Sequence, residues 1–207
     1  MKKTKTQPLL ILISAPSGGG KTTLVQQLLR SRRSMVRAIT CTTRAPRSGE
    51  KNGVDYYFLK AADFLTRVQA GNFLEHATVY GNSYGLLKSE LLGKLRAGKD
   101  VLLNVDVQGA AAIREKARSE PELKDALITI FLTPISLSEI ERRLKRRAAD
   151  APEVILKRVA AARQEIVQWK NFDYLLLSSS KEEDLRRALA IIEAEKMRVQ
   201  RAQPPGL

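Results

Sequence analysis

The fold is decided by residues 9–23, which read LLILISAPSGGGKTT. Leu9 to Ser14 form a short, continuous apolar run, which is typical of a strand buried in a parallel sheet. Residues 22–33 follow a glycine-rich turn and carry apolar side chains at helical spacing, beginning with Leu24 and Val25. A buried strand, a glycine loop and a helix in this order predict the start of an α/β fold.

The glycine loop has the spacing of a phosphate-binding loop. Residues 15–22 read APSGGGKT, close to the pattern G-x-x-x-x-G-K-[ST], with Ala15 where the first glycine is usual. In such a loop the backbone N–H groups turn inward and the following helix adds its positive N-terminus. Lys21 would reach the β- and γ-phosphates of a nucleoside triphosphate, and the Thr22 hydroxyl would ligate Mg²⁺. An ordinary glycine-rich turn is the alternative, and the strand–loop–helix context favours the nucleotide loop.

Strands and helices alternate along the rest of the chain. Further core strands are expected at Val36–Cys41, Val101–Val105, Leu127–Leu132 and Tyr174–Leu177. Helices are expected at Leu87–Ala97, Gln108–Arg118, from a Ser136–Glu139 capping box through Arg147, at Pro152–Trp169 and at Glu182–Arg201. A polar loop, Thr42–Asp55, leads into two short strands and a helix, at Tyr56–Leu59, Phe73–Tyr80 and Ala62–Ala70. We predict a P-loop NTPase fold with a five-stranded parallel core sheet and helices on both faces.

Composition narrows the class of protein. The chain has 207 residues, which suits one well-packed core, and no apolar run long enough to cross a membrane. A secretory signal is rejected for residues 1–15 because their apolar run is too short and feeds the glycine loop. The single cysteine, Cys41, allows no internal disulfide and fits the cytoplasm. The net charge of +14 favours polyanionic partners, which are nucleic acid, acidic membrane or small phosphorylated molecules.

An arginine-bearing segment points to the second substrate. Residues 40–58 read TCTTRAPRSGEKNGVDYYF, in which Arg44 and Arg47 precede a glycine turn and tyrosines. Arginine forks match phosphate oxygens, so these side chains could grip one phosphate, although a solvated basic loop is the alternative. The T-T-R-x-P-R-x-G-E-x-x-G-x-D-Y-x-F pattern resembles the guanylate kinases. The resemblance extends to residues 73–75 (FLE), 84–85 (YG), 106–109 (DVQG) and the arginines after Ser136.

This resemblance implies a kinase that transfers the γ-phosphoryl group of ATP to GMP and dGMP in purine nucleotide metabolism, with Mg²⁺ as cofactor. It implies that the GMP phosphate is held by Arg44, Arg47, Tyr56 and Tyr84, and that the guanine side is formed by Thr40, Glu75 and Asp106. The implied ATP-binding residues are Ala15, Pro16, Ser17, Gly18, Gly19, Gly20, Lys21, Thr22 and Thr23. The implied catalytic residues are Lys21, Arg44, Arg143, Arg147 and Arg158.

The resemblance also implies a domain organisation. Residues 1–43 and 88–207 would form the P-loop core, and residues 44–87 would form a small α+β insert for GMP. Within the core, a helical lid would extend from about residue 146 to about residue 158. Insert and lid would close over both nucleotides, because water would otherwise accept the phosphoryl group.

The implied chemistry is consistent with the residue types. Guanine presents adjacent N1–H and N2–H donors, which one carboxylate such as Glu75 accepts, whereas adenine has no such pair. The nucleophile would be a phosphate oxygen that is already ionised, so alignment and charge neutralisation suffice and no general base is needed. His76 is therefore given a structural role.

Four positions depart from the family pattern. Ala15 replaces the first loop glycine, and Leu86 follows Tyr84-Gly85 where a Ser or Thr commonly contributes a hydroxyl to guanine. Asn104 stands where many members have an acid, and Ser178 ends the fifth strand where an Asn-Asp pair is common near the adenine. A leucine cannot donate, so either the affinity for guanine is reduced or Thr40 carries that hydrogen bond. We expect an active enzyme in both cases.

Three alternatives remain at this point. A ribose 1,5-bisphosphate kinase of the same fold would not need Glu75 or the full Arg44–Arg47–Tyr56–Tyr84 set. A non-catalytic guanylate-kinase-like binding module would not need intact Lys21 and Thr22. The basic run at residues 142–147 allows weak, non-specific nucleic-acid association as a side property. The sequence carries no signal for oligomeric state, and a homodimer is the working hypothesis.

Overall fold

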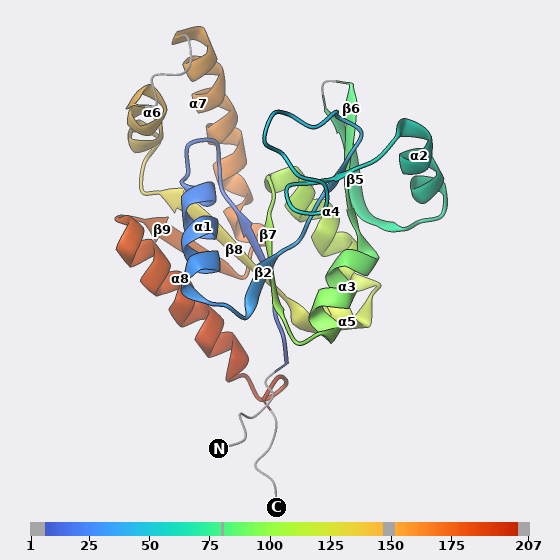
Figure 1. Ribbon diagram of the computed structural model, residues 1–207. Helices are drawn as coiled ribbons and strands as arrows, with labels where there is room; N and C mark the ends of the chain where they lie inside the picture. The colour runs from blue at the N-terminus through green and yellow to red at the C-terminus, as the bar shows by residue number, and fades with distance from the viewer. Residues whose placement is uncertain (1–6, 80, 147–151, 203–207) are drawn as a thin grey trace, which may run out of the picture.

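The computed structural model describes residues 7–79, 81–146 and 152–202, which form two sheets (Figure 1). The larger sheet has five parallel strands, as the sequence predicts, and their order is β2-β7-β1-β8-β9. Its strands are β1 (Leu10–Ser14), β2 (Met35–Arg37), β7 (Asp100–Asn104), β8 (Leu127–Pro134) and β9 (Tyr174–Ser178). Its helices are α1 (Lys21–Ser31), α3 (Lys88–Arg96), α4 (Val107–Arg118), α5 (Pro121–Ala126), α6 (Leu137–Arg146), α7 (Pro152–Ile166), the 3₁₀ turn η1 (Val167–Asn171) and α8 (Lys181–Lys196).

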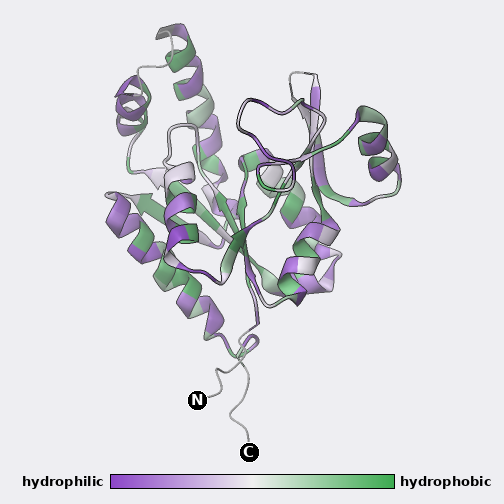
Figure 2. Ribbon diagram, in the orientation of Figure 1, coloured by the Kyte–Doolittle hydropathy of each residue, from purple (hydrophilic) through white to green (hydrophobic). Residues whose placement is uncertain are grey.

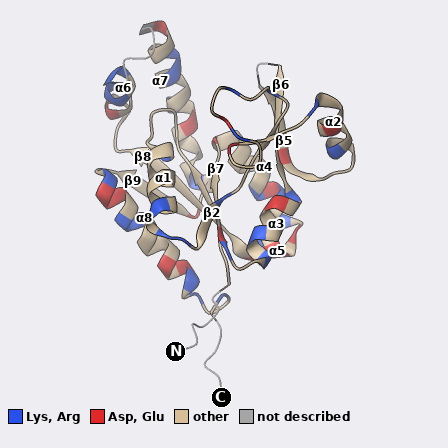
Figure 3. Ribbon diagram, viewed as in Figure 1, with Lys and Arg blue, Asp and Glu red and all other residues tan. Residues whose placement is uncertain are grey.

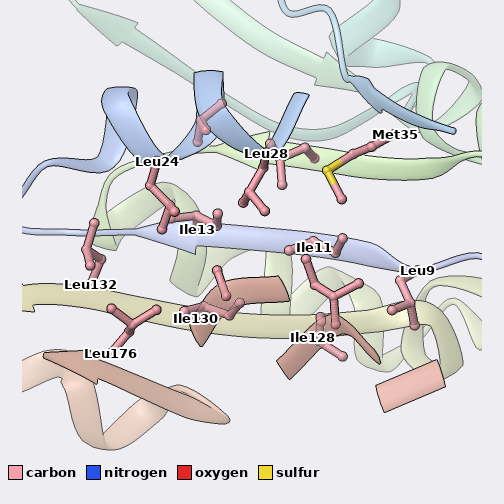
Figure 4. Close-up of a cluster of buried hydrophobic side chains, with 14 of the residues drawn as sticks. Leu9, Ile11, Ile13, Leu24, Leu28, Met35, Ile128, Ile130, Leu132 and Leu176 are labelled. Atoms are coloured by element: carbon pink, nitrogen blue, oxygen red, sulfur yellow. The ribbon is translucent and has the colours of Figure 1, made fainter. Parts of the chain in front are cut away.

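The central strand β1 is buried on both faces, which explains its continuous apolar sequence. Successive side chains of a strand point to opposite faces, so Leu9, Ile11 and Ile13 pack with residues of α1 and α8. Figure 4 shows this cluster. Leu10 and Leu12 pack in a second cluster, with residues of α3, α4 and α5. In Figure 2 the core strands are correspondingly hydrophobic and α8 is striped with polar residues. Helices therefore cover both faces of the sheet.

A smaller mixed sheet lies beside the core and has the strand order β4-β3-β6-β5. Its elements are β3 (Cys41–Thr42), β4 (Tyr57–Phe58), β5 (Phe73–Val79), β6 (Asn82–Leu87) and the helix α2 (Ala61–Gln69). The single strand predicted over Val36–Cys41 is wrong, because the chain leaves the core sheet after β2 and enters the small sheet at β3. Glu90 holds this crossing, since its carboxylate accepts hydrogen bonds from the backbone N–H of Ile39 (2.9 Å) and the Tyr57 hydroxyl (3.1 Å).

Several element boundaries differ from the prediction. Strand β6 and the six-residue helix α5 were not predicted, and the last helix ends at Lys196 rather than Arg201. The Ser136 hydroxyl caps α6 by accepting from the N–H of Glu139 at 3.2 Å, as predicted. The Glu139 carboxylate, however, pairs with Arg142 and Arg143, so only half of the expected capping box forms. Within the described ranges no helix is long and apolar enough to span a membrane.

Candidate active site

The glycine loop follows the buried end of β1 and leads directly into α1. Gly18 and Gly20 have φ angles of +80° and +97°, which side chains with a Cβ rarely adopt. A Cβ atom at Gly19 would lie 2.8 Å from the Cβ of Ala15, so Ala15 and Gly19 fit only as a pair of small residues. Ala15 therefore fits into this tight loop, which leads into the N-terminus of α1. Such a loop is suited to phosphate oxygens.

Lys21 reaches across the sheet from the first turn of α1. Its Nζ donates to the carbonyl oxygen of Val105, just beyond β7, at 2.7 Å. Burial lowers the pKa of Lys21, and the nearby carboxylates of Asp106 and Glu165 partly oppose this effect. The lysine is therefore a partly buried cation held beside the glycine loop.

Glu165 is a site residue that the sequence analysis missed. Its Oε2 on α7 accepts a hydrogen bond from the backbone N–H of Ser17 at 3.0 Å, which ties α7 to the loop. The two residues are separated by 148 positions, and no local pattern marks the contact.

The arginine segment forms a compact cluster on the small sheet. Arg44 donates to both carboxylate oxygens of Glu50, at 2.8 and 3.0 Å, and Glu50 also accepts from the N–H of Arg47. The Arg44 guanidinium lies 5.5 Å from the Tyr56 ring centroid, and the Tyr56 and Tyr84 rings meet edge to face at 6.3 Å. Arg44, Tyr56 and Tyr84 therefore come together, and Glu50 orients the loop that carries Arg47.

Glu75 and Asp106 interact where the small sheet approaches the core. Burial, and secondarily the charge of Asp106, raise the pKa of Glu75 to about 7. Asp106 caps α4 by accepting from the N–H of Gly109 at 2.7 Å. The same Asp106 charge acts on Lys21. Asp106 is thus near both the lysine of the glycine loop and the carboxyl of Glu75.

Leu86 pairs with Glu75 across β5 and β6, but its side chain faces the core. It is 2% exposed and packs in the cluster that contains Leu74 and Leu91. The position of the expected hydroxyl is therefore occupied by a core side chain, and Leu86 supplies no hydrogen-bond donor to the site.

We expect Leu86→Ser to destabilise the fold by about 3 kcal/mol or more, because it leaves a cavity and buries a hydroxyl. Urea unfolding measures this free energy. Leu65→Ser is the matched control, since Leu65 is 57% exposed on α2 and should change stability by less than ~0.5 kcal/mol. Equal stability of the two variants would contradict the core role of Leu86.

A cavity of about 300 Å³ opens beside the glycine loop, between α1, α6 and the start of α8. Arg143 lines this cavity, and its Nε pairs with Glu139 (2.8 Å) while its Nη1 donates to the Ser178 hydroxyl (3.2 Å). Ser178 in turn donates to the buried Asp184 at 2.7 Å. Hydrogen bonds from Arg142 and Arg143 lower the pKa of Glu139 to about 2. Figure 3 shows the resulting mixture of basic and acidic residues on α6.

The remaining predicted residues are distributed as follows. Thr40 is half-buried at the entrance to the small sheet, where its carbonyl oxygen accepts from the N–H of Tyr57 at 3.0 Å. Arg158 lies on α7, and Arg147 falls outside the described residues. Asn104 is exposed at the end of β7, in register with Ile13. His76 is exposed near the Phe73 ring.

Mg²⁺ suits the residue types beside the glycine loop. The side chain of Thr22, in the first turn of α1, is exposed there. No group of three or more metal-binding side chains occurs in the described part of the chain. Mg²⁺ commonly takes few protein ligands and completes its shell with phosphate and water oxygens, so one hydroxyl beside a phosphate loop fits it.

A phosphate loop at the end of the central parallel strand, a lysine beside it and an arginine–tyrosine cluster on the smaller sheet are typical of a P-loop kinase of small phosphorylated acceptors. Comparison with known proteins narrows this class. The guanylate kinase family model matches residues 7–195, and the chain belongs to that family.

Individual relatives agree over nearly full length. The chain is 40% identical to a guanylate kinase of Alkalilimnicola ehrlichii, with 94% of this chain and 93% of that protein covered. It is 39% identical to one of Ruegeria pomeroyi, with 99% and 92% covered. The crystal structure of guanylate kinase from Anaplasma phagocytophilum is similar at a TM-score of 0.70 and 32% identity, covering 96% and 92% of the two chains.

Proposed function

We propose that the chain acts as a guanylate kinase through the residues described above, transferring the γ-phosphoryl group of ATP to GMP or dGMP. The observation that carries the assignment of residues is the position of Asp106. Its charge acts on both Lys21 and Glu75, so the phosphate loop and the acceptor-base carboxylate both lie near this residue.

The acceptor is held at both ends in this proposal. Arg44, Arg47, Tyr56 and Tyr84 bind the GMP phosphate, since guanidinium and phenol groups donate to phosphate oxygens. The Glu75 carboxylate accepts from N1–H and N2–H of guanine, and Thr40 and Asp106 complete the base side. Because Leu86 supplies no hydroxyl, guanine recognition depends more heavily on Glu75.

The donor lies across the glycine loop. Residues Ala15 to Thr23 hold the phosphates of ATP, and the adenosine occupies the cavity beside Arg143. Lys21, Arg143, Arg147 and Arg158 neutralise charge on the transferring group, with Arg44 on the acceptor phosphate. Mg²⁺ on Thr22 would supply further charge neutralisation at the ATP phosphates. No residue needs to take a proton from the nucleophile, because the acceptor phosphate oxygen is already ionised.

The proposal is tested by measuring ADP release from ATP and Mg²⁺ with GMP, AMP, CMP, UMP or ribose 1,5-bisphosphate as acceptor. Turnover with GMP alone is expected. Turnover with the sugar bisphosphate alone would favour the rival kinase of the same fold. ATP binding without turnover on any acceptor would favour a non-catalytic binding module.

The pKa of Glu75 predicts how GMP use depends on pH. Only the ionised carboxylate accepts both guanine N–H groups, so kcat/KM for GMP should fall as the pH drops through about 7. Well below that pH the loss should approach about tenfold per pH unit. The phosphate of GMP also titrates near ~6. Glu75→Gln should therefore remove the component near 7 and keep the lower one. A wild-type profile that is flat between pH 6 and 8 would contradict the assignment.

We also propose that residues 44–87 move as a GMP-binding insert and that the segment from about residue 146 to about residue 158 acts as a lid. Arg44 lies on the small sheet, whereas Lys21 lies beside the core sheet. Closure would align the acceptor phosphate bound by Arg44 with the ATP phosphates bound by Lys21. Small-angle scattering should give a smaller radius of gyration with both nucleotides than without. Indistinguishable profiles would contradict closure.

The remaining proposals concern setting and partners. We propose a cytoplasmic enzyme. The single cysteine, Cys41, is consistent with this location, because it is buried and its burial raises the pKa of the thiol to about 11.

We also propose a homodimer. Sedimentation velocity tests this by measuring the mass of the species in solution. Non-specific nucleic-acid association would be weak, since Glu139 and Glu141 pair with Arg142, Arg143 and Lys145 of the basic run. Absence of oligonucleotide binding at low salt would end that proposal.

A further inference from the structure

One polar atom near the donor cavity has no protein partner. The side-chain oxygen of Gln27 is buried and has no hydrogen-bond partner within the described residues, and Gln27 lines the cavity. Buried acceptors in folded proteins are nearly always paired with protein, water or ligand. Because Gln27 lines the cavity, a rotation of its side chain would present this oxygen to a molecule bound there, which would supply the missing donor.

Gln27 is placed at the end of the cavity farthest along α1 from the phosphate loop. Gly20, Thr23, Leu24 and Gln27 all line the cavity, and residues three and four apart share one face of a helix. The rise of an α-helix puts Gln27 about 10 Å along the axis from Gly20. A nucleotide whose phosphates lie on the loop would direct its base toward this end.

Several other hydrogen-bonding groups at this end are already engaged. Ser178 and the N–H of Ser179 both donate to Asp184, and Ser178 also accepts from Arg143. Ser180 caps α8 by accepting from the N–H of Glu183 at 3.1 Å. The Ser178 hydroxyl is thus turned to Asp184, whereas the Gln27 oxygen has no partner among the described residues.

We propose that the Gln27 side-chain oxygen accepts a hydrogen bond from the 6-amino group of adenine, making Gln27 a specificity-determining residue for the phosphoryl donor. Side-chain amides pair well with adenine because its amino group donates beside a ring nitrogen that accepts. A purine without that amino group leaves the oxygen unpaired, which is how sites built around a hydrogen bond reject an analogue that lacks it. The inference rests on the proposed function, which assigns this cavity to ATP.

The test compares ATP with purine riboside 5′-triphosphate, which carries hydrogen in place of the 6-amino group. We expect wild-type protein to favour ATP in kcat/KM by about 10- to 100-fold. Gln27→Met should lose most of that preference through a lower kcat/KM for ATP, with an unchanged KM for GMP. Gln26→Met is the matched control, because Gln26 is an exposed neighbour on the same helix, and it should keep the preference.

The outcomes separate the inference from the function on which it rests. Equal preference for ATP in wild type and Gln27→Met would overturn the role of Gln27. Wild-type protein that forms no GDP with ATP would overturn the proposed function itself. The Met variant should melt at or above the wild-type temperature, because it replaces an unpaired buried oxygen. Gln27→Leu provides the same comparison should the Met variant fail to fold.

Discussion

Replacing Lys21 with methionine is expected to lower kcat/KM for ATP and GMP by about 10³-fold. The ammonium is held 2.7 Å from the Val105 carbonyl, beside the glycine loop that we propose binds the ATP phosphates. In this partly buried position a positive charge interacts strongly with charge that develops during phosphoryl transfer. Methionine keeps much of the side-chain length but removes the charge, so the loss should appear chiefly in kcat.

Arg30→Met is the control for this variant, because Arg30 is exposed in the last turn of the same helix. It removes one positive charge without touching the loop and should retain nearly full activity. A Lys21→Met variant within tenfold of wild type would contradict the catalytic role of the lysine.

Glu75→Gln is expected to lower kcat/KM for GMP by about 10²- to 10⁴-fold. A carboxylate accepts both guanine N–H groups, whereas an amide offers one acceptor and presents a donor to the second N–H. Leu86 cannot compensate, because its side chain is buried in the core cluster. Steady-state kinetics with GMP varied at saturating ATP measures the effect.

Stability distinguishes this loss from misfolding. The raised pKa of Glu75 means that the folded state binds this proton more tightly than the unfolded state. The ionised carboxylate therefore costs stability as the pH rises from about 4.5 to 7 and above. Glu75→Gln should be at least as stable as wild type at pH 8 in urea unfolding. A variant that is both less stable at pH 8 and unimpaired with GMP would contradict the account of Glu75.

The core fold follows from local sequence because β1, the glycine loop and α1 each carry a strong pattern. The switch from β2 to β3 could not be predicted in the same way. Residues 36–41 contain no glycine or proline that would mark a break, and the crossing between sheets is held by Glu90, about fifty residues later. Helix α5 is only six residues long, which is too short to show a helical period.

The same difference between local patterns and long-range contacts applies to the residues of the site. The arginines, tyrosines and acids of the acceptor side lie in motifs that the family resemblance identifies, although their roles stay predictions. Glu165, Asp184 and Gln27 have no such signal. Their significance depends on contacts made in the folded chain, such as that between Ser17 and Glu165, or on a hydrogen bond that is missing.

In the proposed reaction the γ-phosphoryl group passes directly to GMP. Incubation with ATP labelled at the γ-phosphate, GMP and Mg²⁺, followed by separation of the products, shows where the group goes. We expect the label in the β-phosphate of GDP, with little inorganic phosphate. Label recovered only as inorganic phosphate, or remaining in ATP, would contradict it.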